Sequence, residues 1–143
     1  MMTLGANIFV KYLEVEGKKV ALQIWDFGGE DLYQHLLPSY SAGSSAGIFM
    51  YDITRISSVE SIDEWLMRFK HGLNGEGKDI PVLLVGNKLD LEEKRTTSYE
   101  YAVNLAKTRV LTGCVECSAK TGKNVEYIFE SVTHKMLKNV KMI

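Results

Sequence analysis

From residue 46 onward, short apolar runs typical of buried strands alternate with amphipathic runs typical of helices. The strongest of these strands, residues 80–86, contains Val82-Leu83-Leu84-Val85 without a polar interruption, as strands buried on both faces do. Strands that alternate with helices pair in parallel through right-handed crossovers. The sequence therefore predicts an α/β fold with a mostly parallel sheet. Its strands span residues 46–51, 80–86 and 110–116, and its helices start near residues 57, 97 and 124.

A different pattern precedes this part of the chain. Residues 8–15 and 18–26 read as two strands, and Glu16-Gly17 between them indicates a hairpin turn. Residues 31–40 fit a short, irregular helix. At the other end of the chain, Asn124 is expected to cap the last helix with its side chain.

Polar side chains follow the strongest strand directly, in the run Asn87-Lys88-Leu89-Asp90. A carboxylate such as that of Asp90 can accept two hydrogen bonds from the N1–H and N2–H edge of guanine, a donor pattern that adenine lacks. Asn87 can tie neighbouring loops to the base, and the aliphatic stem of Lys88 can cover one face of the ring. This run predicts a guanine site at the carboxyl end of the strand.

A second polar run, Ser118-Ala119-Lys120, follows the strand predicted over residues 110–116. Ala119 can offer its backbone N–H to guanine O6, and Lys120 can cover the other face of the ring. Because the carboxyl ends of parallel strands meet at one edge of the sheet, both runs are expected to line one nucleotide site.

Asp26 ends the second strand of the predicted hairpin, and two glycines follow it at positions 28 and 29. An aspartate at a strand end can bind Mg²⁺, directly or through water. Gly29 and its neighbour allow the backbone to approach a phosphate closely. Taken alone, this D-x-x-G pattern also fits an ordinary cap at the end of a strand.

These motifs resemble those of the Ras superfamily of small GTPases, and of its Rab-like members most. The resemblance runs from Thr3 to about residue 137 and rests on Thr3-Leu4-Gly5, on Ile24-Trp25-Asp26 with Gly29, on Tyr51-Asp52-Ile53-Thr54, on Gly86-Asn87-Lys88-Leu89-Asp90 and on Glu116-Cys117-Ser118-Ala119-Lys120. It implies a P-loop-NTPase-like three-layer α/β/α sandwich, guanine nucleotide (GDP or GTP) and Mg²⁺ as cofactors, and GTPase regulators or effectors as partners. It also implies that Thr3 joins Asp26 in binding Mg²⁺.

Two departures from the family pattern limit this expectation. No G-x-x-x-x-G-K-[ST] run precedes the guanine motifs, so we expect a truncated domain that lacks the first strand, the phosphate loop and the first helix. Residues 72–78 fit G-x-x-x-x-G-K, but Asp79 follows, and the run lies after a helix and before a strand. Glu30 occupies the position where the family usually has the glutamine that orients the attacking water.

We therefore expect weak GTP binding, and no efficient hydrolysis unless the site is completed in trans. The alternatives are a non-catalytic pseudo-GTPase that serves as an interaction module or scaffold, and a fragment without an independent role.

Loss of the first strand would leave two neighbours, residues 20–25 and 46–51, with free edges. These strands could pair directly, associate with a second copy of the chain, or receive a strand from a partner. We expect self-association through the exposed edges.

Composition narrows the remaining functions. With 143 residues, of which 45% are hydrophobic, the chain fits a single domain, residues 1–143. A net charge of −1 argues against nucleic-acid binding, and no apolar run is long enough to span a bilayer. The sequence shows no secretory leader and no terminal cysteine for a lipid anchor, so the expected location is the cytoplasm. Cys114 and Cys117 are expected to be structural, since positions three apart on a strand face opposite sides.

Overall fold

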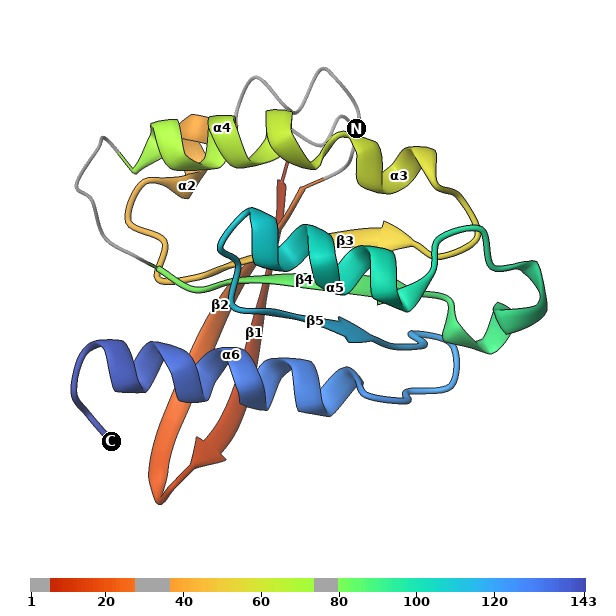
Figure 1. Cartoon of the computed structure of the whole chain (residues 1–143). Helices are drawn as coiled ribbons and strands as arrows, with labels where there is room; N and C mark the ends of the chain where they lie inside the picture. Colours follow the sequence, from red (N-terminus) through yellow and green to blue (C-terminus); the bar gives the residue numbers. More distant parts are fainter. Residues whose placement is uncertain (1–5, 28–36, 74–79) are drawn as a thin grey trace, which may run out of the picture. The chain divides into compact units, whose positions relative to one another are not determined.

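The computed structural model describes residues 6–27, 37–73 and 80–143 (Figure 1). The chain forms two compact units, one from residues 1–44 and 63–79 and the other from residues 45–62 and 80–143. Each unit is described by itself below. That residues 1–143 act as one domain stays a prediction.

The first unit contains an antiparallel hairpin of β1 (Ala6–Val15) and β2 (Lys18–Phe27), which confirms the predicted pair of strands. The register runs from the pair Ala6 and Phe27 to the pair Val15 and Lys18. Both turn residues have positive φ, 47° at Glu16 and 77° at Gly17. Two positive φ values in a two-residue loop are typical of a type I′ turn, whose twist matches that of the strands.

The first unit also contains α2 (Leu37–Ser41) and most of α4 (Ile62–Gly72). The Ser41 hydroxyl donates a hydrogen bond to the Phe69 carbonyl at 3.0 Å. Gly72 allows this close packing, because a Cβ there would lie 1.8 Å from Ser41 Oγ. The single helix expected from residue 57 is instead divided into α3 (Ser57–Glu60) and α4, because Ser61 adopts a turn conformation with φ −83° and ψ 5°.

The second unit contains a parallel sheet in the order β3 (Gly47–Asp52), β4 (Val82–Asn87) and β5 (Gly113–Glu116). Asp52 pairs with Asn87 in the register, and Gly86 pairs with Glu116, so the three carboxyl ends meet at one edge. This arrangement confirms the predicted parallel α/β sheet, and it positions the polar runs that follow β4 and β5.

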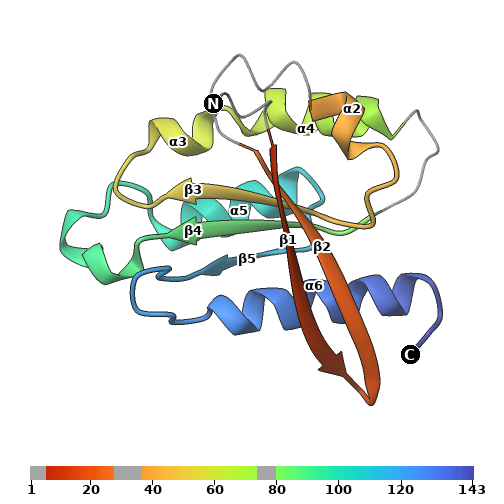
Figure 2. The same ribbon diagram turned by 180° about the vertical axis from the view of Figure 1, so that it is seen from behind.

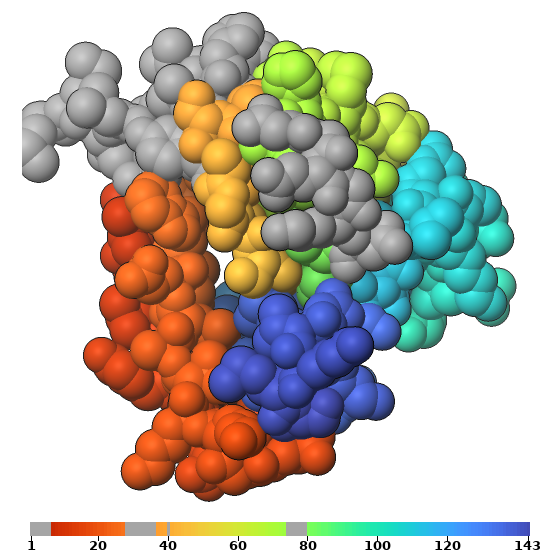
Figure 3. Space-filling view, turned by 90° about the vertical axis from the view of Figure 1, so that its left-hand side faces the viewer, coloured from red at the N-terminus to blue at the C-terminus, as the bar shows by residue number. Residues whose placement is uncertain are grey.

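Helices cover this sheet in layers. Ile128 and Val132 of α6 (Val125–Asn139) pack with Leu83 and Val85 of β4 and with Cys117. Leu84, which alternates with these residues and so faces the other side, is fully buried. The helix α5 (Tyr99–Thr108) lies in front of β4 in Figure 1 and behind it in Figure 2. The C-terminal end of α6, in dark blue, forms part of the surface seen in Figure 3.

The last strand is shorter than predicted, because residues 110–112 close α5 instead of extending β5. Val110 has a φ of 58°, and the Leu111 N–H donates to the Ala106 carbonyl at 2.8 Å. A left-handed residue and a backward hydrogen bond of this kind are typical of helix C-termini. An apolar run cannot reveal this conformation, which is unusual for a valine.

The prediction that the Asn124 side chain caps the last helix is also wrong. Asn124 precedes α6, but its side chain makes no capping hydrogen bond. The residue is left-handed, with a φ of 64°, and its amide donates to the Glu116 carbonyl at 2.7 Å. Asn124 therefore ties the start of α6 to the end of β5.

Among the residues that the structure describes, β2 and β3 belong to separate sheets. None of the described helices is both long enough and apolar enough to cross a membrane.

Candidate functional site

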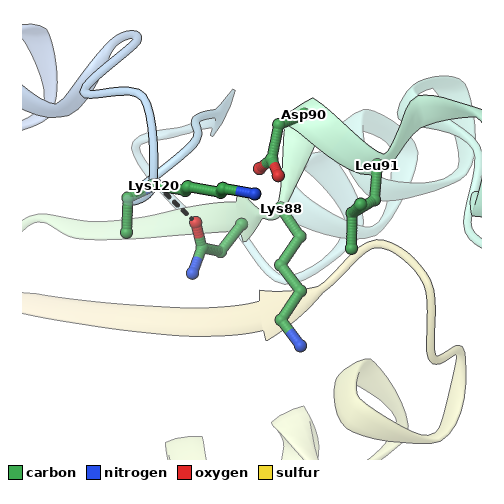
Figure 4. A pocket seen from close by; sticks show the side chains of 6 residues that line it. Lys88, Asp90, Leu91 and Lys120 are labelled. Atoms are coloured by element: carbon green, nitrogen blue, oxygen red, sulfur yellow. Dashed lines mark hydrogen bonds between the residues drawn. The ribbon is translucent and has the colours of Figure 1, made fainter.

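A pocket of about 330 Å³ lies in the second unit, beyond the ends of β4 and β5 (Figure 4). The run after β4, which continues into the 3₁₀ helix η1 (Leu89–Lys94), lines one part of it, and the run after β5 lines another. The structure therefore brings the two predicted polar runs together. The lining residues are Asn87, Lys88, Asp90, Leu91, Ala119 and Lys120.

Asn87 joins the two runs. Its Oδ1 accepts a hydrogen bond from the Ala119 N–H at 3.0 Å, drawn as the dashed line in Figure 4. A backbone hydrogen bond from the Leu89 N–H to the Cys117 carbonyl, 2.9 Å long, adds a second link. The sequence assigns the Ala119 N–H to a base, whereas here the Asn87 side chain accepts it.

The carboxylate of Asp90 is oriented by Ser118, a residue that is almost completely buried. The Ser118 hydroxyl donates to Asp90 Oδ1 at 2.7 Å and accepts a hydrogen bond from the Thr121 N–H at 3.1 Å. These contacts fix the rotamer of the carboxylate. A carboxylate has about four acceptor positions, so Asp90 can still accept further hydrogen bonds from a ligand. Figure 4 shows Asp90 and Lys120 pointing toward one another across the pocket.

Lys88 has a left-handed backbone with a φ of 73°, which for a lysine costs roughly 1–3 kcal/mol. Its ammonium reaches the end of β3, where Nζ lies 2.9 Å from Asp52 Oδ2. Partial burial by itself raises the pKa of the Asp52 carboxyl, but hydrogen bonds from Thr54 and Lys88 outweigh burial and hold this pKa below its ordinary value. Asp52 belongs to one of the runs that resemble the family, but the sequence alone does not predict a role for it at the site. Its position beside Asn87, at the end of the neighbouring strand, is seen only in the register of the sheet.

Arg95, which directly follows η1, supports the polar run that comes after β5. The sequence alone does not predict this role of Arg95. Its guanidinium makes two hydrogen bonds to the Glu116 carboxylate, at 2.6 and 2.8 Å, and two more to Glu92. Hydrogen bonds to Glu116 and then Glu92 raise the pKa of Arg95 above its ordinary value, so it stays charged. Because Glu116 is the last residue of β5, these contacts fix the point at which the Ser118 run begins.

The other predicted site residues lie elsewhere. Thr3, Gly29 and Glu30 fall outside the described residues. Asp26 is an exposed residue of β2 in the first unit. Within residues 6–27, 37–73 and 80–143, no group of three or more His, Cys, Asp or Glu side chains could hold a metal ion. The described chain thus offers a single predicted oxygen ligand for Mg²⁺, whereas its pocket has the carboxylate that a guanine base requires.

Comparison with known proteins points to one family. The Ras family profile matches residues 1–138. Ras-related protein Rab-19 from Homo sapiens is 36% identical over 136 residues, which cover 94% of this chain and 61% of that protein. The protein of the same name from Mus musculus is 35% identical over 136 residues, which again cover 94% of this chain and 61% of that protein. The one from Xenopus laevis is 37% identical over 127 residues, or 89% of this chain and 58% of that protein. The chain therefore spans about three fifths of the length of these curated relatives.

Proposed function

Because the chain belongs to the Ras family of small GTPases and is Rab-like, we propose that its pocket binds the base of a guanine nucleotide. The single observation that carries this proposal is the Asp90 carboxylate, which lines the pocket and is oriented by the buried Ser118 hydroxyl. A fixed carboxylate matches the two adjacent N–H donors of guanine, and adenine offers no such pair.

The remaining pocket residues support a flat, aromatic ligand. The stems of Lys88 and Lys120 lie on the wall of the pocket and can cover apolar ring faces while their ammonium groups stay hydrated. The backbone hydrogen bond from the Leu89 N–H to the Cys117 carbonyl holds the two loops together, so little ordering of the protein is needed when the base enters.

We propose that these 143 residues bind nucleotide mainly through the base, with a Kd near the millimolar range. The printed sequence contains no phosphate loop, whose backbone N–H groups and lysine bind the β- and γ-phosphates in P-loop proteins. Each missing charge-assisted hydrogen bond removes roughly 1.5–3 kcal/mol, and about 1.4 kcal/mol is tenfold in affinity. Efficient hydrolysis is not expected of these residues unless a second chain completes the site.

The proposal is tested by titration calorimetry of the 143-residue chain with guanosine, inosine, adenosine, GDP and GTP. We expect guanosine to bind and adenosine not to bind, with inosine weaker because it lacks the 2-amino donor. Asp90→Ala should weaken guanosine binding at least about tenfold, since it removes charge-assisted hydrogen bonds. Glu130→Ala changes an exposed acid on α6, away from the pocket, and serves as the control.

A second candidate function is a non-catalytic interaction module with the family fold, favoured by Glu30 at the position where the family usually has the glutamine that orients the attacking water. No binding of guanosine, GDP or GTP at concentrations well above the expected Kd, with a folded chain, would support this module and overturn the nucleotide proposal.

We propose that the partners are the regulators or effectors typical of the family. A second copy of the chain is a further proposed partner, since β2 and β3 each lie at an edge of their described sheets. Light scattering over a concentration series tests this self-association, and a monomer at every concentration would exclude it.

A further inference from the structure

The ion pair between Lys88 and Asp52 joins two loops that follow neighbouring strands. Asp52 is the last residue of β3, and Lys88 directly follows β4. The side chain of Lys88 is half exposed, whereas that of Asp52 is only 13% exposed. The ion pair therefore joins the lysine, a side chain with many rotamers, to a carboxylate that is nearly buried.

Asp52 itself has little freedom. Its Oδ1 accepts hydrogen bonds from the Thr54 N–H at 2.8 Å and from the Thr54 hydroxyl at 2.6 Å, and this leaves Oδ2 directed at Lys88. Its backbone N–H donates to the Ser58 hydroxyl at 2.9 Å. Contacts on both oxygens and on the backbone hold the carboxylate in one orientation.

The consequence concerns the stem of Lys88, which lines the pocket. A lysine stem is flexible, and covering a ring face requires one of its many rotamers. Holding the ammonium at β3 while the left-handed backbone fixes the other end leaves the stem stretched along the pocket wall (Figure 4).

We propose that Asp52 is a positioning residue, which holds Lys88 in the conformation that covers one face of the bound base. This inference rests on the proposed function, because it assigns a role within the same site. It also gives a role to an ion pair that joins two segments following neighbouring strands while its lysine stays half exposed.

The first test is binding of guanosine to the chain and to three variants. Asp52→Asn keeps the acceptor for Thr54 but removes the charge that holds Lys88, and we expect three- to tenfold weaker binding. Lys88→Met keeps an unbranched stem without its charge. In the Lys88→Met background, Asp52→Asn should have no further effect, since the interaction is already absent. An equal loss in both backgrounds would overturn the proposal.

A matched control is Glu64→Gln, which removes the exposed pair between Glu64 and Arg68 on α4. We expect it to leave guanosine binding unchanged. Urea unfolding of Asp52→Asn and Glu64→Gln should show both variants fully folded under the conditions of the binding experiment, which separates positioning from a general loss of structure.

The second test needs no ligand. NMR relaxation of the Lys88 ε-carbon, assigned by its absence from Lys88→Met, should show a lower order parameter in Asp52→Asn than in the unmodified chain. If guanosine does not bind but the order parameter falls, the proposed function fails and the positioning of Lys88 stands. If the order parameter is unchanged, the positioning role is wrong, whatever the binding result.

Discussion

Gly86 is the residue at which the end of β4 is packed most closely. A Cβ at this position would lie 2.7 Å from the Tyr51 hydroxyl oxygen and 2.9 Å from the Ile53 side chain. Tyr51 is buried and cannot move aside into solvent. Glycine thus lets β3 and β4 pack tightly directly before Asn87, so the spacing of the strands and the position of the pocket depend on it.

We expect Gly86→Ala to lower the free energy of unfolding by about 1–3 kcal/mol, because the added methyl group overpacks the contact with Tyr51. Gly113→Ala on neighbouring β5 is the matched control, since its nearest contact would be an ordinary 3.8 Å to Leu83. Urea unfolding of both variants checks this. Equal stability of the two would show that Tyr51 adjusts without cost.

Sequence reasoning predicts Asn87, Asp90 and Ser118 as site residues because each follows a recognisable strand. It does not give Asp52 or Arg95 a role, because their contacts join segments far apart in the chain. Arg95 and Glu116 are 21 residues apart in the chain. Asp52 ends β3, whereas Lys88 follows the end of β4. Contacts of this kind depend on the register of the sheet, which residue types alone do not fix.

At the scale of elements, the two long helices of the second unit begin in different ways. Ser98 caps α5 in the expected manner, since its Oγ accepts a hydrogen bond from the Tyr101 N–H at 3.0 Å. Asn124 instead supplies a link to β5. Both residue types favour helix starts, so composition does not distinguish a cap from a link between elements.

We expect Ser98→Ala to reduce the free energy of unfolding by about 1 kcal/mol, because one N–H of the first turn of α5 loses its partner. Ser45→Ala, in an exposed loop, is the control and should change stability by less than about 0.5 kcal/mol. Thermal or urea denaturation measures both. A loss no larger than that of the control would contradict the capping role.

Element type is predicted well wherever periodicity is strong, as in the parallel strands and α6. Boundaries are predicted less well, for two physical reasons. Val110 takes a left-handed conformation that is unusual for its residue type, and Ser61 interrupts a continuous amphipathic pattern. Each of these interruptions is decided by tertiary contacts or local turns, not by hydrophobic spacing.

At the scale of the whole molecule, buried titratable groups link stability to pH. Burial raises the pKa of the Cys114 thiol from 9.0 to about 11, and it raises the pKa of Tyr51 as well. In the unfolded chain the thiol ionises at its ordinary pKa, so the unfolded state binds fewer protons between these values. Stability from Cys114 is therefore complete below pH 9.0 and is lost as the pH rises toward about 11.

We expect the urea midpoint to fall between pH 9 and pH 11, in part because the Cys114 thiol ionises more readily in the unfolded chain. Cys114→Ala should show a shallower decline over the same interval, because this thiol no longer titrates. Parallel profiles for the two proteins would show that Cys114 does not contribute.

The hydrogen bond from the Ala119 N–H to the Asn87 side chain makes hydrogen exchange at this amide a measure of whether the pocket is occupied. Without a ligand, that amide proton is protected by a single side-chain acceptor. A base carbonyl that takes over as acceptor exchanges an internal partner for an external one, and the exchange of this one proton with deuterated solvent changes accordingly. If the proposed base binds, hydrogen exchange at this single backbone position therefore reports its binding, and the rest of the sheet need not move.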